Sequence, residues 1–99
     1  MFLCNYLDDI YYNLLIETYD SEYLNSLDEV NFIRVYEIFK KNGFYFINDI
    51  IVKYLEIFEK DAEIIEKEIY LLKEKLGEDF INIISKDLRY LKNLELIEN

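Results

Sequence analysis

The side chains with the clearest potential for chemistry in this chain are its carboxylates. The 99 residues include 21 Asp and Glu, one cysteine and no histidine. Cys4 and Ser85 could serve as nucleophiles, but each would need a general base such as histidine. The Glu-x-x-His pairs of a carboxylate metal centre and the Asp-x-Asp-x-Asp-Gly pattern of a calcium loop are both missing from the sequence. We therefore expect a protein that is not an enzyme and that uses no metal and no cofactor.

The carboxylates are distributed unevenly along the chain. The formal net charge is −10, and residues 1–33 contribute −7 of it because they contain no Lys or Arg. Binding to a nucleic acid depends on the exchange of cationic side chains for counterions, so this distribution disfavours direct nucleic-acid binding. It equally disfavours an anionic membrane surface. A basic protein is the natural partner for such a segment.

The predicted partner-binding residues are the carboxylates and tyrosines of this acidic segment. Tyrosine is favoured at interfaces because it offers a large ring, a polar tip and little rotamer entropy to lose. The candidates are Asp8, Asp9, Tyr11, Tyr12, Glu17, Tyr19, Asp20, Glu22, Tyr23, Asp28 and Glu29. The alternative is that the segment is a solvated acidic face over a core that contains tyrosine.

Apolar spacing predicts helices in the first half of the chain. Residues 2–18 are predicted as one helix, with Leu3, Leu7, Ile10 and Leu14 forming a stripe. A short turn over residues 19–25 precedes a capping box in which Ser26 and Glu29 begin a second helix. This helix is expected to end at Gly43 in a left-handed conformation. Residues 44–58 form the next predicted helix, with a break near Tyr54.

The second half continues in the same way. Asp61 is expected to cap a helix that ends at Gly77, followed by short helices over residues 80–85 and 87–94. The chain has no proline and only two glycines, which leaves few turns for a sheet. The predicted fold class is all-α, with five to seven short helices.

An internal repeat organises these helices. Val35–Gly43 aligns with Ile69–Gly77 at a spacing of 34 residues, and Phe46 aligns with Phe80. After a one-residue deletion, Ile50-Ile51 aligns with Ile83-Ile84. Such a period is typical of stacked helical repeats. We predict a single domain over residues 1–99. It would consist of an acidic, Tyr-rich third (1–33) holding a degenerate copy and of repeat units at about 35–68 and 69–94. These two and a half repeats would form a stack or a compact bundle.

The repeat also resembles a known family. The Asn42-Gly43-Phe44 turn, the apolar segment 49–58 and a helix ending in Leu76-Gly77 are similar to the helical repeat of mitochondrial transcription termination factor proteins. The resemblance covers about residues 30–94 and implies stacked helices and nucleic-acid binding. Leu55 and Leu88 stand where that family has proline, and its nucleic-acid-binding members are basic. A nucleic-acid-binding repeat fragment is therefore the least favoured alternative.

In composition the chain also resembles small acidic phage-type inhibitors of the anti-CRISPR kind. We expect a protein that inhibits a larger, basic, nucleic-acid-handling enzyme, such as a CRISPR or restriction effector, by occupying its nucleic-acid or regulatory surface. Its carboxylates would replace phosphates and its tyrosine rings would take base-stacking positions. A helical-repeat adaptor, an antitoxin or immunity protein, and a homodimer remain alternatives.

A cytoplasmic location is expected, because a single cysteine fits a reducing compartment and neither a secretory signal nor an apolar run long enough to span a membrane is visible.

Overall fold

Short helices make up the fold, which is described by a computed structural model over residues 2–92. Two 3-10 helices, η1 (Phe2–Asn5) and η2 (Leu55–Glu59), accompany seven α-helices. The α-helices are α1 (Asp9–Thr18), α2 (Ser21–Ser26), α3 (Glu29–Lys41), α4 (Ile47–Lys53), α5 (Ala62–Leu76), α6 (Phe80–Lys86) and α7 (Arg89–Lys92). Residues 2–92 contain no strand. The prediction of an all-α fold is confirmed.

The 34-residue period reappears as a repeated order of helices. A long helix, a glycine turn, a short helix and a final turn of helix occur first as α3–α4–η2 and again as α5–α6–α7. Gly43 and Gly77 have φ values of 87° and 88° at the equivalent turns. Buried residues recur at the same spacing, in the pairs Val35 and Ile69, Ile38 and Leu72, Phe46 and Phe80, Ile50 and Ile84, and Ile57 and Leu91. Helices α4 and α6 are offset by 33 residues at both ends, which agrees with the one-residue deletion inferred from the sequence.

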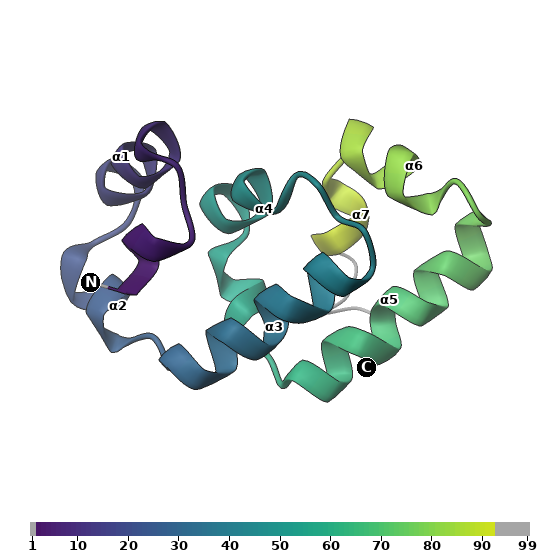
Figure 1. The fold of residues 1–99 in the computed structure, drawn as a ribbon, viewed down its shortest axis with the longest axis horizontal. Helices are drawn as coiled ribbons and strands as arrows, with labels where there is room; N and C mark the ends of the chain where they lie inside the picture. The colour runs from purple at the N-terminus through teal and green to yellow at the C-terminus, as the bar shows by residue number, and fades with distance from the viewer. Residues whose placement is uncertain (1, 93–99) are drawn as a thin grey trace.

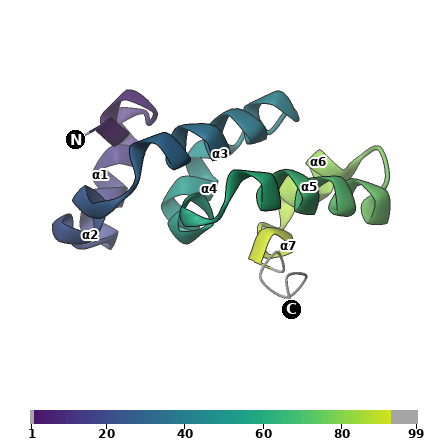
Figure 2. The ribbon, with the colours of Figure 1, turned by 90° about the horizontal axis from the view of Figure 1, so that it is seen from below.

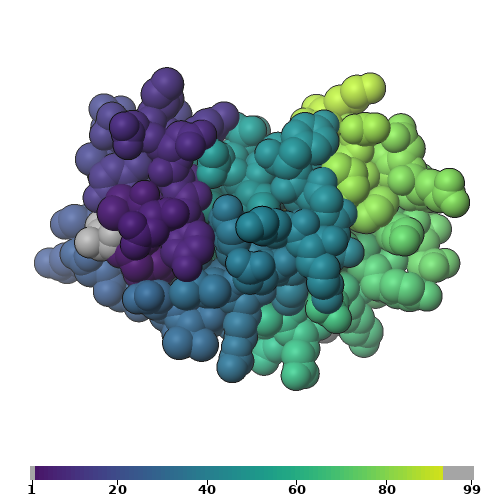
Figure 3. Space-filling model, in the orientation of Figure 1, coloured from purple at the N-terminus to yellow at the C-terminus, as the bar shows by residue number. Residues whose placement is uncertain are grey.

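The first two α-helices occupy the place of a half repeat at the start of the chain. Helix α1 packs against α4, and α3 packs against α5. Figures 1 and 2 show α1, α4 and α6 succeeding one another along the longest axis, while α3 and α5 form a second row. In the space-filling view, consecutive parts of the chain follow one another along this axis (Figure 3). Each unit thus contacts mainly its neighbours, as expected for a helical repeat.

Aromatic rings join the units through the core. The ring of Phe58 in η2 stacks on Phe32 at 4.9 Å between centroids and lies 5.6 Å from Phe39, both on α3. Phe39 contacts Phe44 at 5.0 Å, and Phe44 reaches Phe80 of the next unit at 6.1 Å. Burial of such large rings contributes strongly to the stability of the core.

The N-terminal segment differs from the single helix predicted for residues 2–18. The chain leaves helical geometry between η1 and α1, so the predicted stripe of apolar residues is interrupted there. Leu3 and Leu7 are buried, whereas Ile10 and Leu14 are exposed. Tyr6 lies in the break and packs edge-on against Phe32 and Tyr36, at 5.7 and 5.0 Å. Tertiary packing of these rings therefore overrides the local helical periodicity.

One of the predicted helix caps is wrong. The cap of α3 is Asp28, whose Oδ1 accepts a hydrogen bond of 3.2 Å from the backbone N–H of Asn31. Ser26 instead ends α2, and its hydroxyl donates to the backbone carbonyl of Tyr23 at 2.6 Å. The predicted cap of the later helix is confirmed, because Asp61 Oδ1 accepts from the backbone N–H of Glu63 at 2.8 Å.

The predicted break near Tyr54 also exists, since Tyr54 separates α4 from η2. Within residues 2–92, no helix has both the length and the apolar character needed to cross a membrane. The last residues of the predicted final helix, 93 and 94, lie outside the described residues.

Candidate protein-binding surfaces

Most of the predicted acidic residues lie at helix N-termini. Asp8, Asp20 and Asp28 are the N-cap residues of α1, α2 and α3. Asp9, Glu22 and Glu29 are in the first turns of the same helices, and Glu17 alone lies near the C-terminal end of α1. A carboxylate at a helix N-terminus is stabilised by the helix dipole by about 0.3–1 kcal/mol. This placement offsets part of the repulsion within the acidic segment, and all seven residues remain exposed.

Two of these N-cap carboxylates accept further hydrogen bonds. Asp20 Oδ1 accepts from the backbone N–H of Glu22 at 3.4 Å. The side chain of Asp8 makes no capping bond in its own helix, but its Oδ2 accepts from Asn48 Nδ2 at 3.3 Å. Asp8 therefore ties the start of α1 to α4.

Three of the four predicted tyrosines, Tyr11, Tyr19 and Tyr23, lie at the contact between α1–α2 and α4–η2. Tyr19 donates from its hydroxyl to the backbone carbonyl of Val52 at 3.2 Å, and Tyr23 donates to Glu59 Oε2 at 2.6 Å. Tyr12 is partly buried against the core. The hydroxyls of Tyr19 and Tyr23 are engaged within the chain, so a partner would meet mainly the exposed parts of these two rings.

The surroundings of three of these tyrosines raise the pKa of the side chain. A hydrogen bond with the carboxylate of Asp49 raises the pKa of Tyr11. Burial raises the pKa of Tyr19, and burial together with the hydrogen bond to Glu59 raises that of Tyr23. All three tyrosines therefore keep their hydroxyl proton to a higher pH than a free tyrosine does, because burial or a neighbouring carboxylate disfavours the phenolate.

An acidic hollow lies where α2, α3, η2 and the start of α5 meet. Its volume is about 430 Å³, and its lining consists of Ser26, Asp28, Asn31, Glu59 and Asp61. In the part of the chain that the structure describes, three carboxylates and no basic side chain therefore line this small space. Asp28 was among the predicted residues, whereas Glu59 and Asp61 were not, because they follow the acidic segment by about thirty positions in the sequence.

Asn31 fixes the shape of this hollow. Its Nδ2 atom donates to the backbone carbonyls of Phe58 at 2.9 Å and of Lys60 at 2.7 Å. These two carbonyls flank Glu59 in the chain, so the amide holds η2 and the start of α5 against α3. The carboxylates of Glu59 and Asp61 are thereby brought beside Asp28. The sequence offers no local signal for this arrangement, which depends on contacts across 27 and 29 residues.

The outer face of α1 carries exposed apolar residues. Ile10 is 74% exposed and Leu14, one turn later, is 44% exposed. Asp9, Asn13 and Glu17 surround this pair on the exposed side of the helix. Leu14 also lines a shallow groove of about 550 Å³ between α1, α4 and α6, to which Phe46 and Val52 contribute. An apolar centre with a polar rim is the usual composition of a protein interface.

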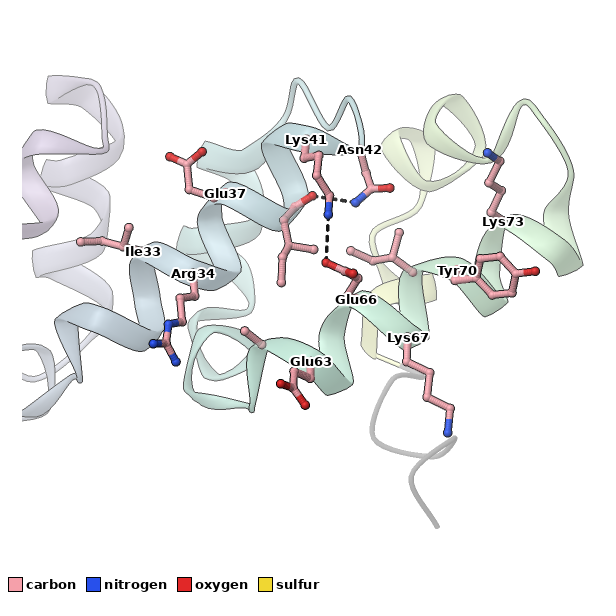
Figure 4. Close-up of a pocket in the computed structure, with 13 residues that line it drawn as sticks. Ile33, Arg34, Glu37, Lys41, Asn42, Glu63, Glu66, Lys67, Tyr70 and Lys73 are labelled. Atoms are coloured by element: carbon pink, nitrogen blue, oxygen red, sulfur yellow. Dashed lines mark hydrogen bonds and ion pairs between the residues drawn. The ribbon is translucent and has the colours of Figure 1, made fainter.

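A groove that the sequence did not predict runs between the two long helices, α3 and α5. It has a volume of about 890 Å³, and its apolar lining includes Ile33, Ile38 and Ile69. Its charged lining comprises four basic side chains (Arg34, Lys41, Lys67 and Lys73) and three acidic ones (Glu37, Glu63 and Glu66). Figure 4 shows the ion pair between Lys41 and Glu66, 3.0 Å long, that joins α3 to α5.

The candidate nucleophiles show no catalytic arrangement in the described part of the chain. Cys4 is exposed on η1. The hydroxyl of Ser85 donates to the backbone carbonyl of Asn82 at 2.7 Å, within its own helix. Among residues 2–92, no group of three or more Cys, Asp and Glu side chains is arranged to hold a metal ion.

Comparison with known proteins assigns no relative to this chain. No protein-family model, no curated protein and no solved structure matches it.

Proposed function

We propose that this chain is a small acidic protein that binds a basic protein partner through the acidic hollow and the neighbouring N-terminal carboxylates. The observation that carries the proposal is the convergence of Asp28, Glu59 and Asp61 on one hollow whose lining, within residues 2–92, includes no basic side chain. Because the like charges repel one another, their proximity is easier to understand if a partner supplies the opposite charge.

An arginine side chain of the partner fits this hollow chemically. The guanidinium group has five N–H donors in a planar fork and binds carboxylates in pairs. Asp28 Oδ1 and Asp61 Oδ1 already accept one bond each from their own helices, and Glu59 Oε2 accepts one from Tyr23. Each carboxylate retains acceptor capacity, since two oxygens offer about four lone-pair sites.

The proposed consequence of binding is inhibition. Basic grooves in nucleic-acid-handling enzymes bind phosphates, and carboxylates placed in such a groove would compete with the nucleic acid. CRISPR and restriction effectors are enzymes of this class. The exposed carboxylates at the N-termini of α1 and α2 extend the acidic surface beyond the hollow. Because these groups are exposed, binding should weaken steeply as salt is added.

An arginine octapeptide is a suitable probe for the hollow. Backbone amide shifts are followed by NMR as the peptide is added to the wild type and to the variant Asp28→Asn/Glu59→Gln/Asp61→Asn. Asparagine caps helices about as well as aspartate, so the caps at positions 28 and 61 are kept while the charges are removed. The matched control is Glu74→Gln/Glu78→Gln/Asp79→Asn, which removes the same charge from exposed positions elsewhere.

The proposal expects shifts centred on Asn31 and the residues of the hollow, together with at least about a tenfold loss of affinity in the hollow variant. The control variant should bind within about twofold of the wild type. Equal weakening in the two variants would mean that the peptide responds only to net charge, and the hollow would then have no specific role.

A further inference from the structure

The groove between α3 and α5 differs in charge from the rest of the molecule. Its lining carries four bases and three acids, a net charge of +1, in a chain whose net charge is −10. Within residues 2–92, Lys41 pairs with Glu66, whereas Arg34, Lys67 and Lys73 make no ion pair. Figure 4 shows these basic side chains extending from both helices. The groove is therefore suited to an acidic occupant.

The base of the groove is apolar. Ile33, Ile38 and Ile69 contribute to its lining, and Tyr70 stands at its edge with 61% of its surface exposed. A groove between two helices with an apolar base and charged edges accepts the apolar face of a third helix. The complementary ligand is thus a helix with exposed aliphatic residues and flanking carboxylates.

The outer face of α1 has this composition. Ile10 and Leu14 form an exposed apolar pair, with Asp9 and Glu17 on either side along the helix and no base anywhere in residues 1–33. In its own molecule this face cannot enter the groove, because α1 packs against α4 and lies at the opposite end of the long axis from α5. A second copy of the chain can present it.

We propose that the groove between α3 and α5 binds α1 of a second copy, so that the chain associates head to tail. Ile10 and Leu14 of one copy contact the isoleucines at the base of the groove, and Asp9 and Glu17 meet Arg34 and Lys67 at its edges. The two contacting surfaces are different, so the interface is heterologous and generates a ring or an open chain rather than a two-fold dimer. The acidic hollow takes no part in this interface, but Asp9 in the first turn of α1 belongs to both proposed surfaces.

Sedimentation velocity tests the association directly. The wild type should show a weight-average mass that rises with concentration up to about 1 mM and falls when salt shortens the Debye length to about 3 Å. Ile10→Glu on α1, and Arg34→Glu/Lys67→Glu in the groove, should each remain monomeric. The controls are Ile16→Glu, on another side of α1, and Lys40→Glu/Lys75→Glu, outside the groove; both should associate like the wild type.

Mixing the two monomeric variants gives the decisive result. Ile10→Glu retains an intact groove and Arg34→Glu/Lys67→Glu retains an intact α1 face, so an equimolar mixture should form a 1:1 dimer and nothing larger. A mixture that stays monomeric, or a wild type that is monomeric at every concentration and salt, overturns the proposal. Association lost in the hollow variant Asp28→Asn/Glu59→Gln/Asp61→Asn but kept in Ile10→Glu would also overturn it, because the contact would then lie elsewhere.

Discussion

The hydroxyl of Tyr23 donates a hydrogen bond of 2.6 Å to Glu59 across 36 positions of the sequence. This contact joins α2 to η2 at the margin of the acidic hollow and engages a carboxylate of the hollow. Burial, followed by the bond to Glu59, raises the pKa of Tyr23 above its usual value of 10.0. The same contact thus connects the fold, the proposed site and the response of the protein to alkali.

Alkaline pH should destabilise the fold through this tyrosine. A raised pKa in the folded state means that the folded protein holds the proton more tightly than the unfolded chain. The resulting stability is fully present below a pH of about 10 and is lost as the pH rises above that value. Urea unfolding between about pH 8 and about pH 11 should show a smaller loss in Tyr23→Phe than in the wild type. Identical losses would show that Tyr23 has the same pKa in both states.

Gly77 should tolerate no side chain without a loss of stability. Its φ of 88° and ψ of −169° lie in a region that only glycine adopts readily. A Cβ atom there would meet no other atom within 4 Å, so the cost is one of backbone conformation alone. We expect Gly77→Ala to lower the free energy of unfolding by about 1–3 kcal/mol. Gly77→Asn should not recover the loss, because asparagine favours a different left-handed region.

The exposed helical substitution Glu74→Ala is the control for this measurement and should change the stability by less than about 0.5 kcal/mol. A Gly77→Ala variant as stable as this control would contradict the assigned turn geometry.

The glycine turns illustrate how much of the fold can be predicted from the sequence. Gly43 and Gly77 mark the helix ends because glycine is the residue that accepts a positive φ at no steric cost, and Asp61 marks a helix start for a similarly local reason. The cap at Ser26 was predicted wrongly because Asp28, two residues later, is an equally good cap. The choice between them depends on which start places Phe32 in the core.

The candidate site was harder to predict than the fold. The sequence shows that acids dominate residues 1–33, but it cannot show that Glu59 and Asp61 join Asp28. That convergence depends on hydrogen bonds from Asn31 to carbonyls almost thirty residues away. The groove between α3 and α5 was missed for a related reason. Its basic residues alternate with acids along each helix and converge only when the two helices pack together.

Asn31 should contribute to both stability and binding. Asn31→Ala removes two donors from the carbonyls of Phe58 and Lys60, and we expect the free energy of unfolding to fall by about 1–3 kcal/mol. Binding of the arginine octapeptide should also weaken, because the loop that carries Glu59 is no longer held against α3. Asn13→Ala, at an exposed position of α1, is the control and should leave both quantities unchanged. Unchanged peptide affinity in Asn31→Ala would show that the hollow does not need this amide.

Direct binding to nucleic acid should be absent. With a net charge of −10, the chain should leave the mobility of duplex DNA and RNA unchanged in a gel shift at about 0.1 M salt. A shift that disappears in Arg34→Glu/Lys67→Glu would identify the groove between α3 and α5 as a nucleic-acid site. It would favour the nucleic-acid-binding alternative over a protein partner.

Parallel affinity capture tests the central claim most directly. Three tagged baits are incubated with the same cell lysate: the wild type, the hollow variant Asp28→Asn/Glu59→Gln/Asp61→Asn and the control Glu74→Gln/Glu78→Gln/Asp79→Asn. Bound proteins are eluted in salt steps and identified by mass spectrometry. The account predicts a basic nucleic-acid-handling protein that elutes at moderate salt from the wild type and the control but is missing from the hollow variant. The same captured proteins on all three baits, or retention that resists high salt, would contradict it.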